Sequence, residues 1–267
     1  MAERPSLLLL GHGSRSAVGV SEYWTLVDLV HRLDPTLPIG GGFIELAQPD
    51  PHTAVRSLVA RGVRSVVTVP LLLLGAGHMK NDGPAMLARA RAGHPGVEFG
   101  YGRALGVDPL VLAVAAERIN EATEGWESQE SAVVLVGRGS YDPDANADLY
   151  KVGRLLQDTG RVAMVEPSFV SLARPSVLDA LERCRRLGAA NVAVVPYFLF
   201  TGVLVDRISA QSRAWRAEHP TVRVRVGRHL GPVRGVARLV LERYGEVLAG
   251  GAYMNCDCCA YRVSTSS

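Results

Sequence analysis

The chain has 267 residues, of which 48% are hydrophobic, and a formal net charge of +3 at pH 7. This length suits one large domain or two small ones, each with its own core. No stretch is both long and free of charge, which disfavours a membrane-spanning segment. The arginines are scattered rather than gathered in a basic stripe, which disfavours nucleic acid as a partner. No signal-peptide pattern is seen near the start, so we expect a cytoplasmic protein.

The first half of the chain predicts alternating strands and helices. Apolar runs bounded by glycine or proline predict strands, and apolar residues at helical spacing predict helices. The expected strands cover 7–10, 37–46, 63–74 and 97–101, and the expected helices cover 20–33, 49–61, 82–92 and 108–122. This order is typical of a parallel sheet covered by helices on both faces.

The second half of the chain repeats the first. At an offset of 126 residues the identical pairs include Gly11 with Gly137, Gly13 with Gly139, Phe43 with Phe169, Pro49 with Pro175 and Pro70 with Pro196. A polar, acidic stretch at 121–131 separates the copies. We therefore predict a duplicated α/β protein with two similar domains, 1–124 and 131–250, each a parallel sheet flanked by helices. A cysteine-containing tail follows at 251–267.

Three residues of the first copy are candidates for chemistry. His12, Glu45 and His78 follow predicted strands, and ligands of open α/β sheets bind at the carboxyl ends of strands. The second copy has Arg138 and Ser171 at the first two positions and no histidine at the third. Two imidazoles and a carboxylate suit a divalent metal such as cobalt, iron, nickel or zinc, and they accept protons near neutral pH. The alternatives are a capping or turn role for either histidine and a polar strand-edge role for Glu45.

Other functions remain open at this point. The Gly-His-Gly-Ser turn at 11–14 is similar to a phosphate-binding loop, but Ala17 stands where a dinucleotide fingerprint needs glycine. Ser14 as a hydrolase nucleophile lacks the G-x-S-x-G elbow. A non-catalytic metal carrier and a two-lobed phosphate-ligand binding protein of the periplasmic type are further alternatives.

Four motifs together resemble the CbiX/SirB sirohydrochlorin chelatases. They lie at 11–15, at 43–49, at Gly77-His78 with Asp82, and at 196–202, so the resemblance spans nearly the whole chain. It implies a class II chelatase of two similar α/β domains that inserts a divalent metal into sirohydrochlorin. It also implies that His12 and His78 bind the metal and handle protons, with Glu45 assisting.

Sirohydrochlorin carries many carboxylates, so cationic side chains should hold it. By position we select Arg15, Lys80 and Arg138 as substrate-binding candidates. The alternative is that each is a solvated surface charge.

The tail adds a second resemblance. Met254, Cys256 and Cys259 match the M-x-C-x-x-C element of long cobalt-chelatase variants, where it is associated with an iron–sulfur cluster, and Cys258 lies between them. A cluster normally takes four thiolates, so a second subunit or another ligand would be needed. The alternative is a flexible tail with incidental thiols. The tail favours a cobaltochelatase of cobalamin biosynthesis over a ferrochelatase of siroheme biosynthesis. Nickel and a homo-oligomer stay open.

Overall fold

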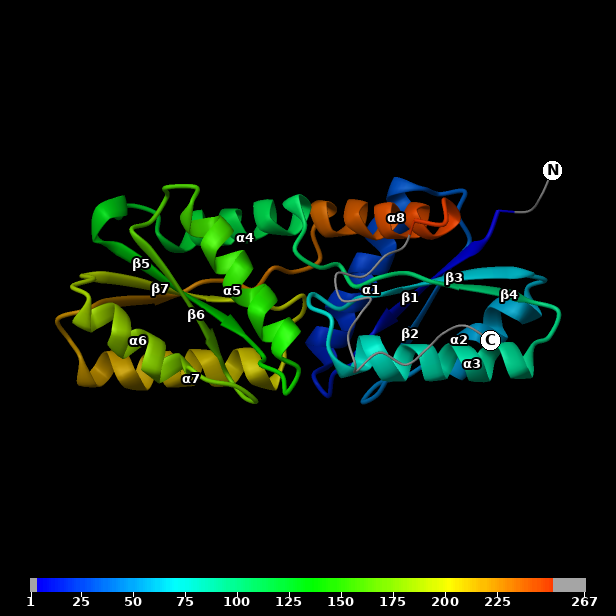
Figure 1. Cartoon of the computed structure of the whole chain (residues 1–267), viewed down its shortest axis with the longest axis horizontal. Coiled ribbons are helices and arrows are strands. Elements are labelled where there is room, and N and C mark those ends of the chain that lie inside the picture. The colour runs from blue at the N-terminus through cyan, green and yellow to red at the C-terminus, as the bar shows by residue number, and fades with distance from the viewer. Residues whose placement is uncertain (1–3, 252–267) are drawn as a thin grey trace. The chain divides into compact units, whose positions relative to one another are not determined.

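The chain forms two compact units, each built on one four-stranded sheet (Figure 1). The computed structural model describes residues 4–251, apart from the side chain of His78. One unit contains the described residues up to Gly106 and from Pro232 onward, and the other is Val107–Gly231. All strand pairs in both sheets are parallel. The predicted architecture of two similar parallel α/β units is confirmed.

The first unit has strand order β2-β1-β3-β4. Its strands are β1 (Ser6–Gly11), β2 (Ile39–Phe43), β3 (Ser65–Pro70) and β4 (Glu98–Tyr101). Its helices are α1 (Ala17–Leu33), α2 (Pro51–Ala60), the π-helical turn η1 (His78–Asp82), α3 (Gly83–Gly93) and α8 (Arg234–Leu248). Helices α2 and α3 pack on one face of the sheet, and α1 and α8 pack together on the other (Figure 1).

The second unit has the equivalent strand order, β6-β5-β7-β8. Its strands are β5 (Ser131–Gly137), β6 (Met164–Phe169), β7 (Asn191–Pro196) and β8 (Arg223–Val226). Its helices are α4 (Pro109–Ala122), the short η2 (Ser128–Glu130), α5 (Pro143–Gln157), α6 (Val177–Arg186) and α7 (Val203–Glu218). Helices α6 and α7 pack together over a core that includes the fully buried Cys184.

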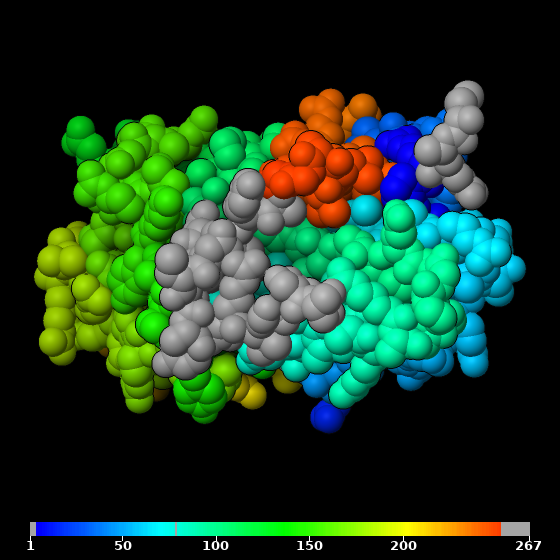
Figure 2. Space-filling view, turned by 45° about the vertical axis from the view of Figure 1, so that its right-hand side comes forward, coloured from blue at the N-terminus to red at the C-terminus, as the bar shows by residue number. Residues whose placement is uncertain are grey.

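The last helix of each repeat packs in the unit formed by the other repeat. Helix α4, from the first repeat, packs on β7 and α5, whereas α8, from the second repeat, packs on α1 and β3. At the surface α8 lies beside the start of the chain (Figure 2), where the Tyr244 hydroxyl donates to the Pro5 carbonyl. The compact units therefore differ from the divisions 1–124 and 131–250, which follow the sequence repeat. A sequence repeat shows that a helix is present in both copies, but it does not show which sheet each helix packs against.

Two predicted strands are longer than the observed ones. The expected strand 63–74 ends at Pro70, although the apolar run continues to Leu74. Neighbouring strands stop at this level, since β1 pairs with β3 only as far as Pro70 and β4 pairs only as far as Thr68. The expected strand 37–46 likewise shortens to Ile39–Phe43.

The glycines of β2 allow close approach of α1. The Tyr23 hydroxyl donates to the Leu9 carbonyl at 3.0 Å and accepts from the Gly42 amide at 2.9 Å. A Cβ at Gly41 would lie 2.6 Å from that hydroxyl and 2.7 Å from the Trp24 ring. The pairing of β1 with β2 continues in regular register through these glycines. They are therefore needed for helix packing rather than for a bulge.

Candidate metal site

His12 and Glu45 lie together at the carboxyl edge of the first sheet, as predicted. The β1–β2 pairing extends past both strands, because the Ile44 amide donates to Gly11 at 2.8 Å and the Glu45 amide donates to His12 at 3.0 Å. This brings His12 Nε2 within 3.1 Å of Glu45 Oε1. The two side chains are 28% and 49% exposed, so the pair is partly sheltered and still accessible from solvent.

Gly13 lets the two loops approach each other. Its φ is +101°, in the region that favours glycine, and a Cβ there would lie 1.7 Å from the Glu45 carbonyl oxygen. A residue with a side chain would therefore push the Glu45 loop away from His12. The small turn residue sets the separation of the candidate ligands.

The second unit has the same backbone arrangement with different side chains. The Val170 amide donates to Gly137 at 3.0 Å, and the Ser171 amide donates to Arg138 at 3.1 Å. Gly139 has φ +85°, like its counterpart in the first unit. The backbone arrangement therefore forms without the histidine and the carboxylate, so these two side chains are not required for the fold.

His78 stands at the start of η1 rather than at a strand end. The turn is closed by the amides of Met79 and Lys80, which donate to the Ala76 carbonyl at 2.8 and 3.0 Å. It contacts β4, because the Tyr101 hydroxyl donates to the Met79 Sδ at 3.7 Å. Since the side chain of His78 lies outside the described structure, its role as the third ligand stays a prediction. Among the described side chains, no group of three or more His, Cys, Asp or Glu is arranged to hold a metal.

The three predicted substrate-binding cations have different surroundings. Arg15 and Arg138 are exposed, each next to the carboxyl end of the first strand in its own unit. Lys80 is only 1% exposed, so its interpretation as a solvated surface charge is wrong. Burial of an ammonium group is stable only when polar partners surround it. The side chain of Lys80 therefore points from η1 into the interior of the unit.

The cysteines divide between the interior and the tail. Burial raises the pKa of the Cys184 thiol to about 12, so it stays protonated and is a poor metal ligand. Cys256, Cys258 and Cys259 lie outside the described residues, so the tail prediction is not addressed by the structure.

Sequence reasoning missed two supporting residues, Tyr23 and Arg243. Tyr23 links α1 to both β1 and β2, and burial raises the pKa of its hydroxyl. Arg243 of α8 is 1% exposed and binds the loop after β4. A signal for it was available, because an offset of 125 residues aligns it with Arg118, which is also buried.

The fold and the site define an α/β protein of two similar units, one of which carries an imidazole–carboxylate pair at the carboxyl edge of its sheet. Imidazole and carboxylate groups are among the ligand types that borderline divalent metals accept. Within the described part of the chain, no helix is long and apolar enough to cross a membrane.

The CbiX family model matches residues 6–122 and again 132–247, and the chain belongs to this family. The two matched segments correspond to the two sequence repeats. The resemblance inferred from the motifs is confirmed at the level of the family.

Relatives with assigned names agree with this membership. The chain is 36% identical over 260 residues to a sirohydrochlorin cobaltochelatase of Priestia megaterium, covering 97% of this chain and 85% of the relative. It is 31% identical over 221 residues to a sirohydrochlorin ferrochelatase of Bacillus subtilis, covering 82% and 83%. Its fold matches the solved structure of SirB from Bacillus subtilis with Fe3+, with a TM-score of 0.80, 30% identity and coverage of 93% and 97%.

Proposed function

We propose that this chain is a sirohydrochlorin chelatase that inserts a divalent metal, with cobalt favoured, into its tetrapyrrole substrate. The observation that carries the proposal is the pair of His12 and Glu45, 3.1 Å apart at the carboxyl edge of the first sheet. The choice of sirohydrochlorin as the substrate is supported by relatives of similar length that are named as sirohydrochlorin chelatases.

The reaction needs a metal site with bases beside it. The metal ion must lose bound water, and the tetrapyrrole must release its pyrrole N–H protons as the metal–nitrogen bonds form. A neutral His12 imidazole can bind the ion or accept a proton, and the Glu45 carboxylate can stabilise the imidazolium that results. We assign His78, which begins η1, as the second imidazole of the same site.

Cobalt is favoured over iron because the cobaltochelatase relative covers 97% of the chain. The ligand types themselves do not separate these metals, since affinities follow the general divalent order. A ferrochelatase is the alternative, supported by the Bacillus subtilis relative and by the SirB structure with Fe3+. An iron–sulfur cluster on the tail cysteines remains a prediction of the cobalt assignment.

The substrate carboxylates need exposed cations, and Arg15 and Arg138 meet that requirement. We propose these two as substrate-binding residues. Lys80 is retained as a supporting cation within η1 rather than as a surface contact, because its side chain is buried. We place the enzyme in the cytoplasm.

The test is an anaerobic assay in which cobalt, iron and nickel are supplied separately and the absorbance bands of sirohydrochlorin are followed. The wild-type chain should accelerate the band shift, and His12→Ala should lose most of that acceleration while unfolding at the same temperature as the wild type. The unfolding temperature is expected to hold because the second unit folds with arginine at this position. A chain that binds metal without changing the rate would instead be a metal carrier.

A further inference from the structure

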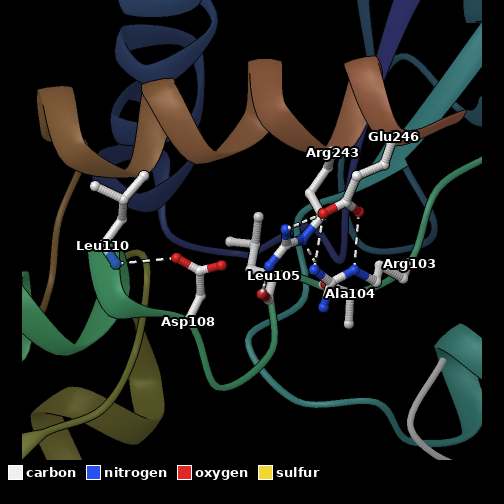
Figure 3. Close-up of polar contacts among 7 residues, drawn as sticks. All are labelled: Arg103, Ala104, Leu105, Asp108, Leu110, Arg243 and Glu246. Atoms are coloured by element: carbon white, nitrogen blue, oxygen red, sulfur yellow. Dashed lines mark hydrogen bonds and ion pairs between the residues drawn. The ribbon is translucent and has the colours of Figure 1, made fainter. Parts of the chain in front are cut away.

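The guanidinium of Arg243 joins α8 to the loop after β4. Its side chain is 1% exposed, and Nε donates to the Ala104 carbonyl at 3.2 Å while Nη2 donates to the Leu105 carbonyl at 2.5 Å. Nη1 donates to Glu246 Oε1 at 2.7 Å, one turn further along the helix (Figure 3). The planar guanidinium thus donates hydrogen bonds to two backbone carbonyls and a carboxylate at once. A lysine ammonium cannot reproduce this planar set of donors.

Glu246 completes the contact between the helix and the loop. Arg103 donates to it from Nε and Nη2, both at 2.8 Å, in the paired geometry that makes arginine–carboxylate contacts strong (Figure 3). Arg103 and Arg243 together hold the pKa of Glu246 below its usual value. The carboxylate therefore stays charged at neutral pH, and it fixes both arginines.

The same loop holds the segment that leads to His78. The Leu105 amide donates to the Leu72 carbonyl and the Gly106 amide donates to the Leu73 carbonyl, both at 2.9 Å. One residue earlier, the Leu71 amide donates to the Leu10 carbonyl of β1 at 2.8 Å, two residues before His12. Hydrogen bonds thus link α8 through the β4 loop to the segment that leads to His78, and that segment is bonded in turn to β1, which leads to His12.

The second unit contains a copy of this arrangement. Arg118 of α4 is 4% exposed, donates to the Leu230 carbonyl at 3.4 Å, and is paired with Glu121. Glu121 in turn lies 3.9 Å from Arg228, and the Leu230 amide donates to the Phe198 carbonyl at 2.9 Å. The copy faces a sheet edge that lacks the histidines and the glutamate. It is therefore a matched control within the same chain.

We propose that Arg243, supplied by the second repeat, is a positioning residue for the metal site of the first repeat. It fixes the β4 loop, and through that loop it fixes Leu72 and Leu73 in the segment that leads to His78. The inference rests on the proposed function, because it assigns Arg243 to the metal site described there. It gives a reason for the exchanged helix: α8 carries the residue that fixes the loop next to the segment leading to the metal site.

The test compares Arg243→Lys with Arg118→Lys. Both changes keep the charge and remove the planar donor set, so both should lower the unfolding temperature. Only Arg243→Lys should weaken Co2+ binding, measured without tetrapyrrole. The expected loss of affinity is about 10-fold, the lower end of the range found when residues that hold metal ligands in place are removed. In turnover its KM for Co2+ should rise, while its KM for sirohydrochlorin should stay within about twofold of wild type. Arg118→Lys should leave both constants unchanged.

Equal Co2+ affinity in the two variants would overturn the proposal, since a purely structural role affects both copies alike. If Arg243→Lys does not fold, Glu246→Gln and its counterpart Glu121→Gln decide the question by the same comparison. His12→Ala is measured in parallel to separate the two proposals. Wild-type Co2+ affinity in His12→Ala would overturn the proposed function. Loss of affinity there, with full affinity in both α8 variants, would overturn the positioning role alone.

Discussion

Replacing Gly13 by alanine tests whether the turn backbone sets the spacing of His12 and Glu45. Gly13 has φ +101°, and a left-handed backbone costs about 1–2 kcal/mol for an L residue. The new Cβ would also lie 1.7 Å from the Glu45 carbonyl oxygen, whereas Cβ atoms essentially never approach within 3.0 Å of a heavy atom outside their own residue and its chain neighbours. The Glu45 loop must then move by about 1.3 Å, the difference between these two distances.

A shift of that size separates the candidate ligands. His12 Nε2 and Glu45 Oε1 start 3.1 Å apart, and under the proposed function the displaced carboxylate would no longer be placed to share a metal ion with the imidazole. Misplacing a reacting group by about 1 Å costs on the order of 100-fold in rate, and we expect kcat/KM for Co2+ to fall by about that factor. The measurement is the anaerobic band-shift assay, with thermal unfolding recorded on the same samples.

Two glycines elsewhere in the chain serve as controls. Gly139→Ala places a Cβ 2.8 Å from the Ala173 amide nitrogen at φ +85°, in the unit without the candidate ligands. Gly62→Ala places an alanine in a left-handed backbone conformation, with no atom within 4 Å of the new Cβ. Both should lose stability and keep activity. If Gly13→Ala inserts Co2+ at the wild-type rate, or if Gly139→Ala loses as much activity, the reasoning about ligand spacing is refuted.

Two further predictions concern stability. Tyr23→Phe removes the acceptor of the buried Gly42 amide and should cost about 1–3 kcal/mol in urea unfolding, whereas Tyr141→Phe, at an 87% exposed side chain, should cost nothing measurable. The Ser176 amide and hydroxyl, with Arg174, lower the pKa of Asp179 from 3.8 to about 2, which an NMR titration can check. Asp179 therefore contributes stability above its unfolded pKa, and the stability difference between wild type and Asp179→Asn should shrink as the pH falls toward about 2. A constant difference would contradict this assignment.

The duplication made most of the fold predictable. Because glycines and prolines recur at a fixed offset, the succession of strands and helices along one half predicted that along the other. The proximity of His12 and Glu45 was predicted from their places at the ends of strands. The end of β3 was not predictable, since the Leu71–Leu74 run stays apolar after its pairing partners have ended. The exchange of α4 and α8 could not be predicted from the sequence either. The amphipathic pattern of a helix shows that one of its faces is buried, but it does not show which sheet buries that face. The burial of Lys80 depends on the π-helical turn, which has no clear sequence signal.

The exchange of the last helices affects what either half of the gene could encode alone. A polypeptide ending after α4 would lack the helix that covers α1 and β3, while its own α4 would have no β7 to pack against. Two such polypeptides could complete each other only by trading these helices reciprocally, as in a domain-swapped dimer. Fusing the copies turns that intermolecular trade into an internal one. The asymmetry of the fused chain, with the candidate ligands in one half and Arg243 in the other, can then be inherited as a single unit.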